Sequence, residues 1–244
     1  MSSRSVLHVG LLCSAAYMTY RSSTSPTPPP SDEEVKAPRD ISTRERVFTR
    51  VARLVASIVK YTTVAGVGCT VAVIYARDHP GPSSRTILEK LVLPGLGSAA
   101  RISITPAVLA GWSLTMLGTT LRLWCYRTLD RFFTFEVTLK EGHELCTGGP
   151  YSLVRHPSYT GWIVQTIGLA AFLGGTGSWA RESGFLGTVP GQLAACAFLA
   201  VETYICMSMV HRCSEEDTLM KSRFGDGWYA WAQRVPYRLL PYVF

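Results

Sequence analysis

PGQLAACAFLAVETYICMSMV, residues 190–210, contains a single charged side chain, Glu202, in 21 residues. A helix crosses the hydrocarbon core of a bilayer with roughly 20 mostly apolar residues, so this stretch predicts a membrane-spanning helix. Across the 244 residues, 47% are apolar and 17% are charged, and the mean hydropathy is +0.17. A soluble domain has roughly 25% charged residues. The composition therefore argues against a water-soluble enzyme.

Four other stretches of the chain are also apolar and nearly free of charge. One of them, 159–175, shortly precedes 190–210, and the two predict a helical hairpin. The five predicted spans are residues 5–20, 54–76, 104–126, 159–175 and 190–210. The predicted fold class is therefore all-α, an integral membrane protein with about five transmembrane helices.

The first predicted span, residues 5–20, is short for a bilayer and contains His8. It suits either an N-terminal anchor or the apolar core of a signal peptide. We favour an uncleaved anchor, because a protein with further spans can use its first one for insertion. Residues 21–40 are rich in Ser, Thr and Pro, a composition typical of a flexible linker.

A few small or polar residues stand out within the predicted spans. Gly111 and Gly118 are suited to close contact between helices. Arg122 falls near the end of its span, where its side chain is expected to reach the headgroups. Glu202 is either a functional group, the default for an intramembrane carboxylate, or a structural group with partners, and the sequence favours neither.

The distribution of charge indicates which parts of the chain share a membrane face. Lys and Arg number 24 against 17 Asp and Glu, a net charge of +7, and arginines at 44, 46, 50 and 53 precede the second span. Such clusters favour the cytoplasmic side, and the basic excess indicates contact with a membrane surface rather than with nucleic acid. Two spans separate the polar segments 136–159 and 211–238, so both lie on one face and can enclose a site.

The first polar segment contains HELCTGGPYSLVRHPSYTGW, residues 143–162. Pro157 suits the first turn of a helix, which would place Arg155 or His156 beside exposed backbone amides. Such a site favours an anionic or carboxylate ligand. The alternative is an interfacial loop whose Arg, His and Tyr side chains anchor the helix at headgroup level.

The second polar segment contains RCSEEDTLMKSRFGDGW, residues 212–228. Arg212, Glu215 and Glu216 can share one face of a helix, either as a surface ion pair or as a group that binds two ligands of opposite charge.

The sequence contains no familiar spacing of metal ligands, although His143, Cys146 and His156 are of the right residue types. No nucleotide-binding glycine motif and no HExxH motif occurs in the sequence, so neither a soluble cofactor fold nor a metal is expected.

Together, these two segments and the apolar hairpin between them resemble the isoprenylcysteine carboxyl methyltransferase family, over roughly residues 104–244. The resemblance implies an enzyme of the endoplasmic reticulum membrane that methylates the C-terminal carboxylate of isoprenylated cysteine with S-adenosyl-L-methionine. It implies that Arg212 contacts the substrate and that Arg212 and Glu216 act in catalysis. The cofactor contacts implied are Glu136, His143, Glu144, Leu145, Cys146, Tyr151, His156, Pro157, Ser158, Tyr159 and Glu216. The family often has Gln at the position of Glu136 and Val at that of Cys146.

The composition of residues 1–103 and the resemblance over 104–244 together suggest how the chain is organised and what it binds. Residues 1–53 would be an anchor and linker, 54–103 a span and loop, and 104–244 a methyltransferase core with a cytosol-facing cofactor pocket. The expected partners are prenylated protein C-termini and the lipid bilayer, and neither nucleic acid nor metal is expected. Three alternatives remain: a phospholipid N-methyltransferase, a sterol reductase-like membrane enzyme, which the C-terminal residues also resemble, and a non-enzymatic membrane adaptor.

Overall fold

The computed structural model describes residues 1–28, 43–135 and 142–244, and only the backbone of residues 43–50. Within these ranges the regular elements are helices, and there is no strand. The all-α prediction is therefore confirmed. The five long helices are α1 (Ser3–Ser22), α3 (Thr43–Asp78), α5 (Pro106–Leu129), α6 (Pro157–Gly174) and α8 (Val189–Phe224).

Shorter elements connect the long helices or close their ends. Three are short α-helices: α4 (Pro82–Leu91), α7 (Trp179–Glu182) and α9 (Asp226–Arg234). Four are single turns of 3-10 helix: η1 (Ala99–Arg101), η2 (Asp130–Phe132), η3 (Gly149–Ser152) and η4 (Phe185–Gly187).

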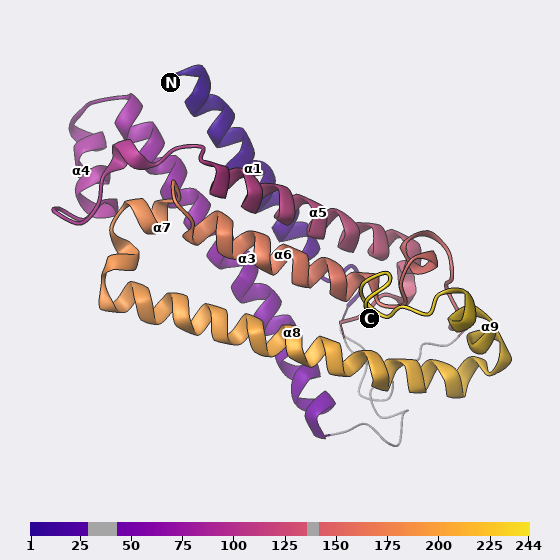
Figure 1. Cartoon of the computed structure of the whole chain (residues 1–244). Helices are drawn as coiled ribbons and strands as arrows, with labels where there is room; N and C mark the ends of the chain where they lie inside the picture. Colours follow the sequence, from indigo (N-terminus) through magenta and orange to yellow (C-terminus); the bar gives the residue numbers. More distant parts are fainter. Residues whose placement is uncertain (29–42, 136–141) are drawn as a thin grey trace.

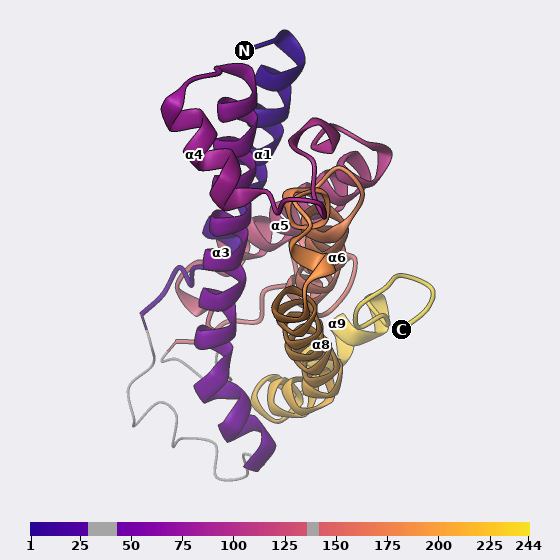
Figure 2. The same cartoon turned by 90° about the vertical axis from the view of Figure 1, so that its left-hand side faces the viewer.

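The long helices form an elongated bundle in which α5, α6 and α8 run alongside one another and α3 crosses them (Figure 1). The first helix, α1, packs against α3 and α5, and Figure 2 shows it beside α3. The N-terminus, α4 and α7 lie at one end of α8, whereas α9 and the C-terminus lie near the other end (Figure 1). The two ends of the bundle therefore consist of different parts of the chain.

Two of the described helices are long and apolar enough to cross a membrane. They are Val51–Asp78, which contains an 18-residue stretch with a mean hydropathy of 1.5, and Val189–Phe224, which contains one with a mean hydropathy of 1.8. The 36 residues of α8 extend about 54 Å at 1.5 Å per residue, well beyond a hydrocarbon core of about 30 Å. The second helix of the predicted hairpin, residues 190–210, thus continues as a helix into the polar segment that follows it. Spans at α1, α5 and α6 stay predictions.

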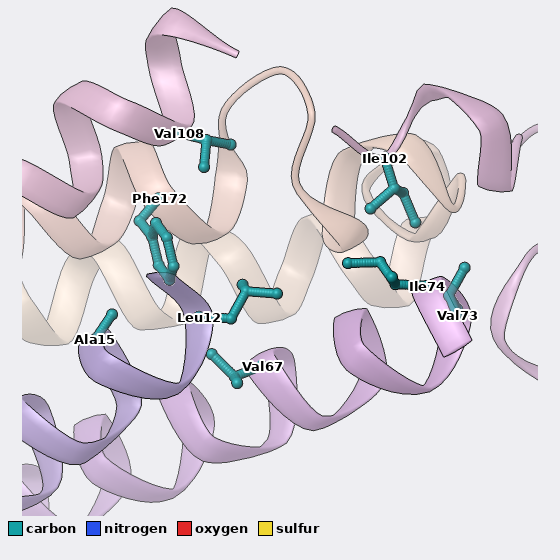
Figure 3. Close-up of a cluster of buried hydrophobic side chains, with 8 residues drawn as sticks. All are labelled: Leu12, Ala15, Val67, Val73, Ile74, Ile102, Val108 and Phe172. Atoms are coloured by element: carbon teal, nitrogen blue, oxygen red, sulfur yellow. The ribbon is translucent and has the colours of Figure 1, made fainter. Parts of the chain in front are cut away.

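One core cluster joins the first helix to the rest of the bundle. Its members come from α1, α3, α6 and the region around the start of α5 (Figure 3). They are Leu12, Ala15, Val67, Val73, Ile74, Ile102, Val108 and Phe172. Because Leu12 and Ala15 are buried among these side chains, α1 is an integral layer of the bundle.

The most extensive contact between helices joins α5 and α6, and glycines make it possible. A Cβ atom added at Gly118 would lie 2.4 Å from the backbone nitrogen of Gln165, and one at Gly111 would lie 2.5 Å from that of Phe172. A Cβ at Gly168 would lie 2.4 Å from the nitrogen of Thr115. The prediction that Gly111 and Gly118 permit close helix contact is confirmed.

The prediction that Arg122 reaches the headgroups is wrong. Its side chain is 2% exposed and points into the bundle. It donates to the carbonyl oxygen of Ser22 at 3.2 Å and to that of Ser158 at 3.1 Å, and it lies 4.7 Å from the ring centre of Trp162. These carbonyls and the aromatic face stabilise the buried charge, so Arg122 joins the end of α1 to the start of α6.

Glu202, whose role the sequence left open, lies buried between α6 and α8 at 2% exposure. It accepts hydrogen bonds from Trp162 Nε1 at 3.1 Å and Thr166 Oγ1 at 2.9 Å. Both donors belong to α6, so the carboxyl group connects the two helices of the hairpin. The structural interpretation with partners is the one that the contacts support.

We expect Gly118→Ala to destabilise the protein, because the new methyl group would overlap backbone atoms of α6 that have no freedom to rotate away. Overpacking of this kind costs about 1–3 kcal/mol. The measurement is the thermal unfolding of the purified protein in detergent micelles. Gly68→Ala in α3 is the matched control, since a Cβ there meets nothing within 4 Å. Equal melting temperatures for the two variants would contradict the close packing of α5 and α6.

Candidate active site

A pocket of about 900 Å³, including its open mouth, lies between the 129–159 region and the polar end of α8. The two polar segments that the sequence placed on one face do meet here. The lining residues are Leu129, Phe132, Phe133, Thr134, His143, Glu144, Leu145, Cys146, Tyr151, Arg155, His156, Ser158, Tyr159, Glu216, Asp217, Met220 and Trp231.

Most of the predicted cofactor contacts line this pocket, and three sites need separate comment. Glu136 lies outside the described residues. Pro157 is buried as the first residue of α6, as the sequence predicted, but it does not line the pocket. Arg212 lines a neighbouring pocket. The roles assigned to all these residues stay predictions.

Glu216 is the centre of a compact polar cluster. Its carboxylate accepts hydrogen bonds from Arg212 Nε at 2.9 Å and from the hydroxyl of Tyr159, and it lies 3.3 Å from His156 Nδ1. The side chain of Arg212 is 3% exposed and that of Glu216 is 22% exposed, so this is not a surface ion pair. Glu215, which the sequence grouped with them, lies on the exposed side of α8.

Asp217 is a site residue that the sequence reasoning missed. Its carboxylate lies 3.1 Å from Arg155 Nη2, from His156 Nε2 and from Arg238 Nε. These partners are about 20 or 60 residues away in the chain, so helical spacing around Arg212 contained no signal for them. The only hint in the sequence was a third acidic residue after Glu215 and Glu216.

The C-terminal residues hold the loop that precedes α6. The backbone nitrogen of Arg155 donates to the carbonyl of Tyr237 at 2.9 Å, and that of His156 donates to Arg238 at 2.8 Å. Farther along, Trp231 Nε1 donates to the carbonyl of Tyr151 at 3.1 Å. These hydrogen bonds fix the loop to the C-terminal segment. The loop therefore does more than anchor α6 at headgroup level, which was the alternative interpretation of the sequence.

The environment of His156 favours its protonated form. Burial disfavours the charged ring, but the hydrogen bonds and charges of Asp217 and Glu216 outweigh burial and raise the pKa of His156 above its usual value. The ring also stacks on Tyr159, with centroids 5.7 Å apart and planes at 6°. A protonated His156 would therefore join the two carboxylates and orient the ring of Tyr159.

A second pocket of about 420 Å³ adjoins the first. The two share Phe133, Thr134, Ser158 and Tyr159 as a common wall. The second pocket lies between α3, α6 and α8, and its apolar lining comes from residues on these helices, namely Ala52, Val55, Ala56, Trp162, Ile205 and Met209. Arg122 and Arg212 supply its two charged groups. A polar pocket and a mostly apolar pocket therefore meet at Tyr159.

The lining of the first pocket suits the chemistry of S-adenosyl-L-methionine. Aromatic rings of Phe132, Tyr151 and Trp231 line one part of it. The carboxylates of Glu216 and Asp217 line another part and suit a cationic ligand. Among the described residues, no group of three or more His, Cys, Asp and Glu side chains is placed to hold a metal ion.

We expect protonated His156 to stabilise the fold in a pH-dependent way. Its pKa is raised in the folded state, so its contribution is fully present below the unfolded pKa of about 6.5 and is lost as the pH rises through the higher folded value. The melting temperature should fall across this window, and His156→Gln should flatten the fall. The exposed His211→Gln on α8 is the matched control and should keep the wild-type slope. A slope that is unchanged in His156→Gln would contradict the protonated pair.

Known proteins resemble part of this chain. The model of the isoprenylcysteine carboxyl methyltransferase (ICMT) family matches residues 111–181. Protein-S-isoprenylcysteine O-methyltransferase B of Arabidopsis thaliana is 29% identical over 128 residues, which are 52% of this chain and 55% of the plant protein. A mouse Delta(14)-sterol reductase is 26% identical over 103 residues, 42% of this chain and 20% of that protein.

The matches span only part of this chain and only part of its relatives. The chain spans about half the length of the plant relative and about a fifth of the mouse reductase. No solved structure matches it significantly. Residues 111–181 include most of α5, all of α6 and the residues between them, with His143, Tyr151 and His156. The resemblance of this chain to the isoprenylcysteine carboxyl methyltransferase family, which the sequence motifs indicated, is thereby confirmed.

Proposed function

We propose that this protein is a membrane enzyme that methylates the C-terminal carboxylate of isoprenylated cysteine with S-adenosyl-L-methionine. The observation that carries the proposal is the shared wall between the polar pocket and the mostly apolar pocket, formed in part by Ser158 and Tyr159. A water-soluble methyl donor and a lipid-modified acceptor need two such compartments that meet at one point. The similarity to the plant isoprenylcysteine methyltransferase agrees with it.

The acceptor needs no general base. An α-carboxyl group has a pKa of about 3.5 and is ionised at neutral pH. The protein must instead align the carboxylate and exclude water from it, and such positioning is worth up to about 7–11 kcal/mol. S-adenosyl-L-methionine supplies the methyl group on a positively charged sulfur when it is bound.

Arg212 is suited to position the carboxylate. It lines the mostly apolar pocket, while its Nε donates to Glu216 in the polar pocket and its Nη1 donates to the carbonyl of Phe135 at 2.7 Å. These two contacts hold a planar guanidinium at the boundary between the pockets. An arginine keeps its charge at all physiological pH values and can bind both oxygens of a carboxylate.

The prenyl chain would occupy the mostly apolar pocket. Val55 and Ala56 of α3 face Ile205 and Met209 of α8 in one buried cluster at this pocket. Each CH₂ group that moves from water to hydrocarbon contributes about 0.8 kcal/mol, so the lipid tail prefers entry from the bilayer between these helices. We place the enzyme in the endoplasmic reticulum membrane as a multi-span protein with its polar pocket toward the cytosol.

The product assay tests the proposal directly. Membranes or purified protein are incubated with S-adenosyl-L-methionine labelled in its methyl group and with N-acetyl-S-farnesylcysteine. We expect a labelled, base-labile methyl ester, and no label on the corresponding cysteine amide, which lacks the carboxylate. Absence of the ester from folded protein that binds labelled cofactor would overturn the proposed acceptor.

We expect Arg212→Lys to lower kcat/KM for N-acetyl-S-farnesylcysteine about 10–100-fold, because lysine keeps the charge and loses the planar fork. Binding of S-adenosyl-L-methionine, measured by titration calorimetry, should change little. Arg223→Lys, an exposed position on the same helix, is the matched control and should behave as wild type. An equal loss of cofactor binding and turnover in Arg212→Lys would contradict the division of roles.

Two alternative activities have their own products. Phospholipid N-methylation would place the label in phosphatidylcholine. Sterol reduction has support from the similarity to sterol reductases over residues that cover 42% of this chain, and it would consume NADPH and saturate a sterol double bond without incorporating label. A non-enzymatic adaptor would give none of these products and would bind no labelled cofactor.

A further inference from the structure

A third pocket lies away from the two that form the candidate active site. It shares no lining residue with either of them. Its lining residues come from α1, α3, α5, α6 and the α7–η4 connection. In Figure 1, α7 lies at the end of the bundle opposite α9. Its volume, including its mouth, is about 900 Å³. The proposed methyl transfer does not use it.

The lining of this pocket is mostly apolar and carries no Lys, Arg, Asp or Glu side chain. Leu12 and Phe172 line it, and both belong to the core cluster drawn in Figure 3. On α3, the small residues Ala65 and Gly66 form part of its wall. Trp179 also lines it, with the ring stacked on Phe185 at a centroid distance of 5.6 Å. The small residues of α3 thus face the stacked rings of Trp179 and Phe185 across the pocket. Such a flat space suits a rigid apolar ligand.

One polar side chain in this lining lacks a protein partner. His8 of α1 is 3% exposed, and the structure gives its ring no hydrogen bond to any of the described residues. Two other polar side chains of the lining have hydrogen-bond partners: Thr70 donates to the carbonyl of Gly66 at 2.7 Å, and Trp179 Nε1 donates to that of Leu91 at 2.9 Å. Because His8 lines the pocket, a ligand hydroxyl in the pocket could hydrogen-bond to its ring.

We propose that this pocket binds a sterol-class lipid, with the sterol hydroxyl hydrogen-bonded to His8 and the ring system against α3. An imidazole ring can both donate to and accept from a hydroxyl group. A phospholipid is disfavoured because its phosphate would meet no cationic side chain in the lining. The ligand would join α1 to α3 and the α7–η4 connection. The inference does not depend on the methyltransferase activity.

The test uses the full chain in phosphatidylcholine nanodiscs with tritiated cholesterol. We expect saturable binding that unlabelled cholesterol displaces and that cholestane, which lacks the hydroxyl group, displaces about tenfold less well. No saturable binding by the folded protein would overturn the proposal. So would equal displacement by cholesterol and cholestane, or displacement by added phosphatidylcholine.

Two variants and a control locate the site. His8→Phe keeps an aromatic ring and removes the hydrogen bond, so cholesterol should bind about tenfold more weakly. Gly66→Leu should abolish binding, because a Cβ there already lies 3.2 Å from Leu173 Cδ2 and a longer side chain would enter the cavity. The exposed His79→Phe at the end of α3 should bind as wild type.

The variants are interpreted only with melting temperatures close to that of the wild type. If neither variant folds, the comparison of cholesterol with cholestane on the wild-type protein decides the role of the hydroxyl group. Energy transfer from tryptophan to the fluorescent sterol dehydroergosterol then decides where the sterol binds. That transfer should fall in Trp179→Phe. Wild-type binding in folded His8→Phe and Gly66→Leu would overturn the assignment to this pocket.

Discussion

Helices α5 and α6 approach until backbone atoms of one occupy the space that a side chain would need on the other, at Gly111, Gly118 and Gly168. This approach sets the position of α6 along its whole length. Because α6 begins at Pro157, the contact also decides where His156 and Tyr159 lie. The polar pocket is built outward from these two residues.

The same contact places a buried charge at a junction of three segments. Arg122 of α5 binds the carbonyl of Ser158 on α6 and that of Ser22 at the end of α1. Removing a guanidinium from water is unfavourable unless its donors are satisfied. The cost is offset by these carbonyls and by the face of Trp162. The start of α6 is therefore held from the side of α5 and α1.

From the other side, α8 and the C-terminal segment hold the same loop. Glu216 and Asp217 bind His156 on its two ring nitrogens, and Asp217 also binds Arg155. The side chains of consecutive residues on a helix point in different directions, so the carboxylates of Glu216 and Asp217 reach different partners. Arg212, one turn before Glu216, stands between the polar pocket and the mostly apolar one. The proposed methyl transfer to a lipid-bearing carboxylate would take place at this boundary.

The sequence by itself determined the all-α class, the helix start at Pro157, the close approach at Gly111 and Gly118, and the meeting of the two polar segments. These follow from local rules: apolar length, proline geometry, glycine size and the number of spans between segments. Only the tertiary structure decided the roles of Asp217, Arg122 and Glu202. Their partners come from remote parts of the chain, and no spacing within one helix records them. Arg122 was misjudged for this reason, because a charge near a helix end can reach the headgroups or buried carbonyls, and packing alone selects between them. The pocket beside His8 likewise exists only where α1, α3, α5, α6 and the α7–η4 connection meet.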